Sequence, residues 1–124
     1  MIKDTFRFQR LEIWKAAILY ARHIYIAADK LPKSELFGLV SQLKRAVLSI
    51  SSNIAEGSGS ITINDFSHYL DISIKSTIET VSELLFALEM GYLSEKDVIL
   101  LYDEAELLIK RIQSFKKSLG RKNE

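Results

Sequence analysis

Apolar residues recur along the chain at spacings of three and four, which is the period of an α-helix with one buried face. The pattern is strongest near the C-terminus, where it runs unbroken through Val98, Leu101, Ala105, Leu108, Ile112, Phe115 and Leu119. Three earlier segments share this period, and no segment alternates apolar and polar residues as a half-buried strand does. The sequence predicts an all-α protein with helices over about residues 8–31, 34–57, 63–90 and 95–119.

The first helix carries two apolar rows. The main row is Leu11, Trp14, Ile18, Ala21, Tyr25 and Ala28, and a partial second row is Ile13, Ala17, Ile24 and Leu31. We expect the main row to face the core and the second row to widen the buried face. Pro32 ends this helix, because proline lacks an amide hydrogen and restricts the residue before it.

Short polar residues and glycines mark the other helix ends. The residues expected to cap helix starts are Ser34, Thr62 and Ser94, the last two each followed three residues later by Asp65 and Asp97. The glycines expected to stop helices are Gly57, which precedes a short Gly/Ser link, and Gly91. Links of about three to six residues between such helices predict an antiparallel up-down-up-down four-helix bundle.

Composition supports a single four-helix-bundle domain over residues 1–124. Of the 124 residues, 48% are apolar and 27% charged, which is ordinary for a globular chain. No apolar run is long enough to cross a membrane, and the N-terminus lacks a signal-like apolar core, so we expect a cytoplasmic protein that does not span a membrane. In the third helix Ser73 and Thr77 occupy positions of the apolar row, so this stretch is either tightly packed or faces something polar.

The residues that catalysis or metal binding needs are scarce. Cysteine is absent, which removes disulfides, thiolate metal sites and cysteine nucleophiles. Asp65 and His68 have the spacing of a carboxylate and a histidine on one helix face, but a di-iron bundle needs two such pairs and two further glutamates. His23 has no serine in a recognisable catalytic arrangement. The sequence therefore predicts a protein that is not an enzyme and needs no metal or cofactor.

Charge is nearly balanced overall but unevenly distributed. The formal net charge is +1, yet residues 1–45 and 110–124 are each net +5 and residues 46–109 are net −9. This asymmetry is compatible with plain solubility and internal charge pairing, or with a basic face for phosphate. The candidate phosphate contacts are Lys3, Arg7 and Arg10, on one face if the first helix starts that early, and Lys110, Arg111, Lys116, Lys117, Arg121 and Lys122 in the last helix.

The second helix is unusually rich in small polar residues. Ser49, Ser51, Ser52 and Asn53 stand where a helix optimised for stability alone would use Ala, Leu, Lys and Glu. Small side chains let another backbone approach closely. One interpretation is a face that contacts another subunit, and the other is close packing within the chain against the third helix. The candidate subunit-interface residues are Gln42, Arg45, Ser49, Ser52, Asn53 and Glu56.

This segment closely resembles the four helix bundle protein family, also called large-subunit ribosomal RNA intervening-sequence proteins. The matching positions are Glu35, Phe37, Gly38, Leu39, Gln42, Leu43, Lys44, Arg45, Ala46, Ser49, Ile50, Asn53, Ile54, Ala55, Glu56 and Gly57. The resemblance extends to both neighbouring helices, at Leu11, Trp14, Phe66, Tyr69, Leu70, Ser76 and Glu79. It departs at Ser60, where the family often has Arg, and at Ile74-Lys75-Ser76, where the family often has Arg/Lys-Gly-Ser.

The resemblance implies more than periodicity can show. It implies a bacterial, ring-shaped homopentamer, because family members of known architecture look like such rings. Related bundles are accessory proteins of diversity-generating retroelements and bind a reverse transcriptase and nucleic acid. The leading hypothesis is a non-enzymatic oligomer that presents a repeated basic face to structured RNA or DNA. The alternative is a protein-interaction scaffold, for example an accessory subunit of a reverse transcriptase, that does not itself bind nucleic acid.

Overall fold

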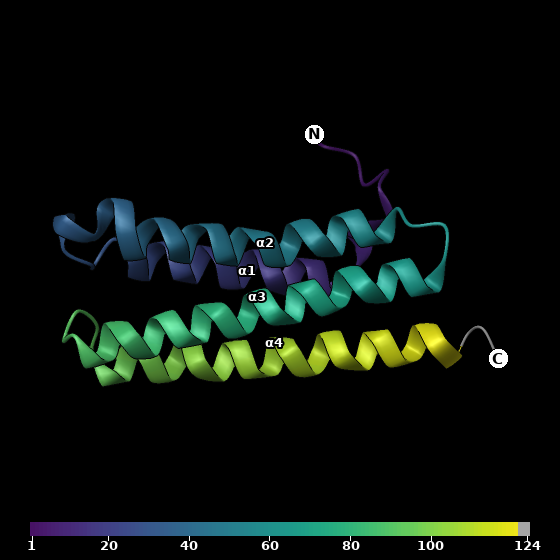
Figure 1. The fold of residues 1–124 in the computed structure, drawn as a ribbon. Coiled ribbons are helices and arrows are strands. Elements are labelled where there is room, and N and C mark those ends of the chain that lie inside the picture. The colour runs from purple at the N-terminus through teal and green to yellow at the C-terminus, as the bar shows by residue number, and fades with distance from the viewer. Residues whose placement is uncertain (122–124) are drawn as a thin grey trace.

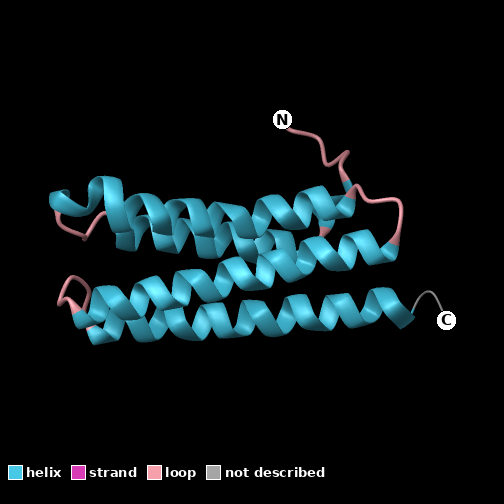
Figure 2. Cartoon of the chain, in the orientation of Figure 1, coloured by secondary structure: helices cyan, strands magenta, loops and turns pink. Residues whose placement is uncertain are grey.

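A computed structural model describes residues 1–121, and this part of the chain contains helices and no strand (Figure 2). The long helices are α1 (Glu12–Ala28), α2 (Ser41–Ser58), α3 (Ile63–Glu89) and α4 (Glu95–Arg121). The short helical segments are the 3-10 helices η1 (Arg7–Arg10) and η2 (Lys33–Glu35) and the π-helix η3 (Leu36–Val40). The prediction of an all-α fold with four long helices is confirmed.

The four long helices lie lengthwise beside one another (Figure 1). α1 packs against α2, α2 against α3 and α3 against α4, and α4 packs back against α1. The α1–α2 and α3–α4 connections lie at one end of the molecule, and the α2–α3 link and the last turn of α4 lie at the other (Figure 1). Because the first and last helices are neighbours, the two basic ends of the chain can contribute to one surface.

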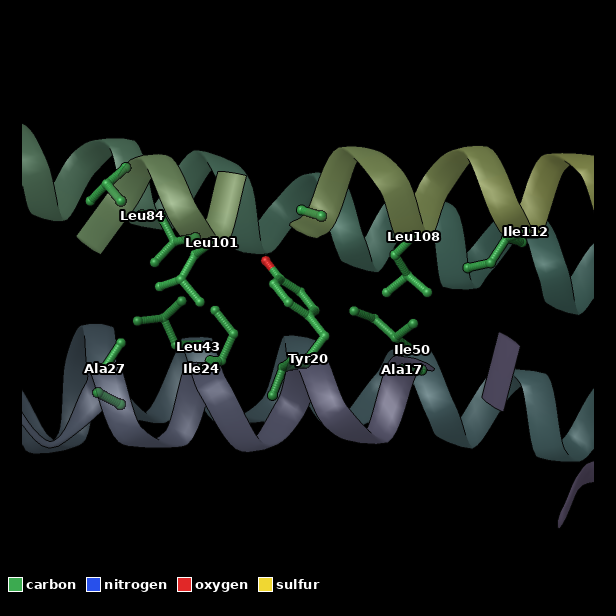
Figure 3. Close-up of a cluster of buried hydrophobic side chains, with 14 of the residues drawn as sticks. Ala17, Tyr20, Ile24, Ala27, Leu43, Ile50, Leu84, Leu101, Leu108 and Ile112 are labelled. Atoms are coloured by element: carbon green, nitrogen blue, oxygen red, sulfur yellow. The ribbon is translucent and has the colours of Figure 1, made fainter. Parts of the chain in front are cut away.

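The core fills the space between the helices, as Figure 3 shows for Tyr20 and Ile24 of α1 opposite Leu101 and Leu108 of α4. Tyr20 is fully buried, and its hydroxyl lies 2.8 Å from the hydroxyl of Thr80. Thr80 Oγ1 donates to the carbonyl of Thr77, so Tyr20 is the donor to Thr80. Burial raises the pKa of the Tyr20 phenol above its ordinary value. This hydrogen bond ties α1 to α3 across the centre of the bundle.

The expected main apolar row of the first helix is correct only in part, since Ala28 is buried and Leu11, Trp14 and Ala21 pack against the core. Ile18 and Tyr25 of that row are exposed, whereas Ala17 and Ile24 of the partial row are fully buried together with Tyr20. The helix is apolar around most of its circumference, so periodicity alone does not select the face that turns inward. The predicted apolar row of the last helix is more accurate. Six of its seven residues are buried, and Phe115 is half-buried.

The starts of α3 and α4 and the end of α3 agree with the sequence prediction. The hydroxyls of Thr62 and Ser94 accept hydrogen bonds from the amides of Asp65 and Asp97, each at 3.1 Å. Gly91 has a φ of 75°, and the amides of Gly91 and Tyr92 donate to the carbonyls of Leu88 and Ala87. This pair of bonds is the Schellman arrangement, which favours glycine at the left-handed position. The predicted caps Thr62 and Ser94 and the Gly91 stop are therefore confirmed.

The ends of the first two helices differ from the prediction. α1 begins at Glu12, because Leu11 is extended and separates it from η1. Ser34 is not the cap of the second helix, since Glu35 caps η3 by accepting a hydrogen bond from the Leu39 amide at 3.3 Å. Gly57 does not stop α2, which continues to Ser58. A Cβ on Gly57 would lie 2.8 Å from the Cβ of Tyr69 in α3, so this glycine permits close helix contact.

Candidate nucleic-acid and subunit interfaces

The N-terminal cations do not share a helix face. Residues 1–6 are not helical, and Arg7 and Arg10 lie in η1. The segment folds on itself: the side-chain amide of Gln9 donates to the carbonyl of Lys3 at 2.8 Å, and Arg10 donates to the carbonyl of Asp4 at 2.6 Å. The expectation that Lys3, Arg7 and Arg10 share one face of the first helix is therefore wrong. All three residues precede α1, and the extended Leu11 separates them from it.

Arg7 nevertheless connects this segment to the last helix. Its guanidinium lies 5.2 Å from the centre of the Phe66 ring in α3, a cation–π contact. Phe66 in turn contacts Phe115 of α4, with ring centres 5.5 Å apart. The N-terminal cations and the C-terminal half of α4 thus lie at the same end of the bundle.

The cations of α4 occupy two faces. Lys110, Lys117 and Arg121 are exposed and follow one another at spacings of seven and four, which places them on one face. Arg111 lies on the α1 side, beside a groove that also contains Glu12. Lys116 is half-buried and pairs with Asp71 of α3 at 2.6 Å, so part of its charge is neutralised within the chain. Lys122 lies outside the described residues.

A groove of about 860 Å³ runs between the beginning of α3 and the end of α4. It is lined by Lys75, Lys116 and Lys117 and by amides of Asn64 and Gln113, which are groups that hydrogen-bond to phosphate. Sequence reasoning missed Lys75, because it stands alone in the acidic middle of the chain and only the α3–α4 packing brings it to the other lysines. We call the cations at this end of the bundle, which lie on more than one face, the basic end: Lys3, Arg7, Arg10, Lys75, Lys110, Arg111, Lys116, Lys117 and Arg121.

The candidate subunit face of α2 divides into two kinds of residue. Gln42, Arg45, Ser52 and Glu56 are exposed. Ser49 and Asn53 are half-buried and make hydrogen bonds within the chain.

Small polar side chains join α2 to α3. The side-chain amide of Asn53 donates to the carbonyl and the hydroxyl of Ser49, and the Ser76 hydroxyl donates to the Ser49 hydroxyl at 2.9 Å. The Ser73 hydroxyl donates to the carbonyl of Ile50 at 2.8 Å. Close intramolecular packing therefore accounts for Ser49 and for the buried Ser73 and Thr77. It does not account for the four exposed residues of the α2 face.

Glu83 of α3 is a buried acid that sequence reasoning missed. Only 9% of the residue is exposed, and its Oε1 atom has no hydrogen-bond partner among residues 1–121. Burial, and next the charge of Glu79, raise the pKa of the Glu83 carboxyl to about 7, while Arg45 of α2 acts in the opposite direction. The sequence signal was its spacing in α3, three residues after Thr80 and four before Ala87, both of which are buried.

The α1–α4 contact carries two ion pairs beside a groove of about 400 Å³. His23 Nδ1 lies 2.7 Å from the carboxylate of Glu104, and Lys30 Nζ lies 2.7 Å from Asp97. The hydrogen bond from Lys30 lowers the pKa of Asp97. The ring of His68 is exposed, and no three histidine, aspartate or glutamate side chains of residues 1–121 gather as a metal site would require.

None of the described helices is both long enough and apolar enough to cross a membrane. The fold and its surfaces define a four-helix protein in which several cations, unpaired among the described residues, gather at one end. The chain belongs to the 23S rRNA-intervening sequence protein family, whose model matches residues 9–114. This confirms the family that the α2 motif resembles.

A solved structure shows the same fold. It is a protein of unknown function from the S23 ribosomal protein family of Bacteroides thetaiotaomicron, 22% identical in sequence, with a TM-score of 0.78. The match covers 85% of this chain and 98% of that one. No curated protein matches the chain.

Proposed function

We propose that this protein is a non-enzymatic oligomer that binds structured RNA through its basic end. The observation that carries the proposal is the groove between α3 and α4, where three lysines and two side-chain amides meet and, among residues 1–121, only Lys116 is paired with an acid, Asp71. The family association with ribosomal RNA supports RNA as the ligand and a cytoplasmic location. No element with a base-reading motif is evident, so recognition would use the phosphate backbone and RNA shape.

The proposal takes the bundle as antiparallel, up-down-up-down, which the alternate ends of the connections in Figure 1 support. It takes the assembly as a homopentamer, which the family resemblance implies. A ring would repeat the basic end and multiply weak phosphate contacts. The exposed residues of α2 would then face a neighbouring subunit, and Arg45→Ala and Glu56→Ala should each lower the assembled mass in light scattering. An unchanged mass in both variants would remove α2 from the interface.

RNA binding is tested by fluorescence anisotropy of a labelled RNA hairpin across a salt series. The wild-type protein should bind with a steep negative dependence of log affinity on log salt, about 0.7–0.9 per phosphate contact. Lys75→Ala with Lys117→Ala should weaken binding and flatten this slope by about one unit for each lysine that engages. The matched control is Lys33→Ala with Lys96→Ala, which removes the same charge from the opposite end of the bundle.

Equal losses in both double variants, or no binding at low salt, would contradict the proposal. The second candidate is then a protein scaffold, for example for a reverse transcriptase. It is favoured by an apolar strip across α3 and α4 in which Ile78, Leu85, Ile99 and Tyr102 are all exposed. Recovery of one protein partner at fixed stoichiometry, without nucleic acid, would support this scaffold.

A further inference from the structure

A single trough follows the contact between α3 and α4, which run side by side (Figure 1). The groove of about 860 Å³ at the basic end is continued toward the middle of the helices by a hollow of about 170 Å³, and Ile78 lines both. Val81 of α3 lines the hollow together with Tyr102, Glu106 and Ile109 of α4. We call the groove and the hollow together the α3–α4 trough.

The trough is cationic toward the end of α4. Lys75 and Lys117 are exposed along the groove and make no ion pair with residues 1–121. Lys116 pairs with Asp71 at 2.6 Å, so these two side chains add little net charge. Lysine ammonium groups bind phosphate as compact point charges. Lys75 and Lys117 therefore give this part of the trough two cations that a phosphate backbone can neutralise.

The rest of the trough offers apolar surface that phosphate does not need. Ile78 is 53% exposed on the α3 side, and Tyr102 is 42% exposed on the α4 side. Ile74 is half-buried in the groove between Ile78 and the lysines. An exposed tyrosine ring can stack on any nucleobase, since every base has a π-face. Glu106 lies beside Tyr102 and would repel phosphate, so this part of the trough favours a base over a backbone group.

The spacing of the two parts suits an unpaired nucleotide. Ile78 follows Lys75 by one helical turn, about 5 Å along α3. A nucleotide whose phosphate meets Lys75 can therefore place its base against Ile78 and toward Tyr102. A paired base is held inside its duplex and must be unpaired and unstacked before it can enter such a site, whereas bases of bulges, loops and single-stranded ends are free to turn outward.

We propose that the α3–α4 trough binds unpaired nucleotides of RNA, with phosphates at Lys75 and Lys117 and a base between Ile78 and Tyr102. This inference rests on the proposed function and narrows its ligand from structured RNA in general to RNA with a bulge, a loop or a single-stranded end. The base contacts are apolar and stacking contacts, so they distinguish unpaired from paired nucleotides rather than one base from another.

Three labelled RNAs test the proposal by fluorescence anisotropy. They are a fully paired duplex, the same duplex with a bulge of three adenosines, and the same bulge built from abasic nucleotides, which keeps every phosphate and removes only the bases. The wild-type protein should bind the adenosine bulge at least about fivefold more tightly than either other RNA, the lower end of stacking on one aromatic ring. The two bulged RNAs should share one salt dependence, because a base contact releases no counterions.

Variants locate the base within the trough. Tyr102→Ala should lower the affinity for the adenosine bulge to that for the abasic bulge, and Tyr102→Phe should restore the preference because the ring remains. Ile78→Ala, on the opposite wall, should also reduce the preference. Lys75→Ala with Lys117→Ala should weaken all three RNAs by a similar factor. The matched control is Leu107→Ala, since Leu107 is an exposed apolar residue of α4 that lines neither part of the trough.

The outcomes separate this inference from the proposed function. Equal affinities for the three RNAs, with a steep salt dependence, overturn the inference and leave RNA binding intact. No binding of any RNA at low salt overturns both. A bulge preference that survives Tyr102→Ala and Ile78→Ala, in proteins that circular dichroism shows to be folded, overturns the trough as the site of the base. A protein partner that is lost in Tyr102→Ala, with no bulge preference, overturns the inference and assigns the trough to a scaffold.

Discussion

α3 packs against α2 through glycine and small hydroxyl residues, whereas α1 packs against α4 beside a groove bridged by ion pairs. At the α2–α3 contact no space remains for one carbon on Gly57, and the Ser73 hydroxyl donates to the backbone carbonyl of Ile50. At the α1–α4 contact the groove measures about 400 Å³, and His23–Glu104 and Lys30–Asp97 lie along its edge. The α2–α3 contact fixes the helix positions by close packing. The α1–α4 contact leaves a groove that charged side chains bridge.

This difference predicts where the bundle is sensitive. A dense contact loses free energy when atoms are added, because rigid neighbours must shift. A contact bridged by partly exposed ion pairs loses little when one charge is removed, because water and salt screen it. The predictions below are ordered from the largest expected change in the free energy of unfolding to the smallest.

Gly57→Ala should destabilise the protein by about 2 kcal/mol, as overpacking does. The new Cβ would lie 2.8 Å from Phe66 Cδ1 and from Tyr69 Cβ, and the second of these atoms is close to the backbone and cannot turn aside. Urea unfolding at fixed protein concentration measures the change. The control is Gly120→Ala in α4, where nothing lies within 4 Å and helix propensity favours alanine by up to about 1 kcal/mol. Equal effects at the two glycines would refute the dense α2–α3 contact.

Tyr20→Phe should cost about 1 kcal/mol, the usual net value of a hydrogen bond. It removes the hydroxyl that donates to Thr80 and ties α1 to α3 between the two contacts. The remaining hydroxyl of Thr80 keeps the carbonyl of Thr77 as its acceptor, which prevents a larger loss. Thermal unfolding followed by circular dichroism measures the change, and a variant as stable as the wild type would mean that this bond contributes nothing.

Glu83→Gln should stabilise the folded chain by about 1 kcal/mol at pH 8 and change little at pH 4. In the folded chain the Glu83 pKa rises from 4.5 to about 7, so folding favours the protonated acid. The groups that face it are Glu79 on α3 and Arg45 on α2. Stability from this group is therefore present at low pH and is lost as the pH rises through about 7.

Urea unfolding of the wild-type and Glu83→Gln proteins from pH 4 to pH 8 measures this difference in stability. Equal stabilities of the two proteins at pH 8 would contradict a raised pKa of Glu83 in the folded chain.

Glu104→Gln should lower the free energy of unfolding by about 0.5 kcal/mol, the range of exposed ion pairs. The His23 and Glu104 side chains are 42% and 28% exposed, so solvent screens their attraction. The effect should diminish further in high salt, which urea unfolding at low and high sodium chloride measures. A loss as large as that of Gly57→Ala would show that the α1–α4 contact depends on charge more than its geometry indicates.

The sequence predicted those parts of the fold that depend on local chemistry. Thr62 and Ser94 cap their helices because a short hydroxyl side chain can reach an amide three residues on, whatever the helix packs against. Gly91 adopts a positive φ that its own position at the helix end requires. The apolar row of the last helix was correct because its spacing of three and four residues runs unbroken to Leu119, whereas the exposed apolar residues, such as Leu100 and Leu107, form no row that continues into the C-terminal half.

The incorrect predictions concern residues whose burial or role depends on packing between helices. α1 is apolar on faces that the monomer leaves exposed, and only contact with the other helices selected Ala17 and Ile24 for the core. Gly57 has the sequence context of a helix stop, but the distance to Tyr69 determines its use. Lys75 and Glu83 became candidate functional residues through neighbours that are remote in sequence, Lys117 for the first and Arg45 for the second.

The π-helix over Leu36–Val40 has a consequence for how the length of this chain can change during evolution. A π turn contains more residues than an α turn, so loss of one residue there yields an α turn while both ends stay in place. The same deletion at the start of α2 would rotate all following residues by about 100° and turn Val47 and Ile54 out of the core. This chain should therefore tolerate the loss of one residue at this turn better than the same loss within α2, whose register is fixed by the core.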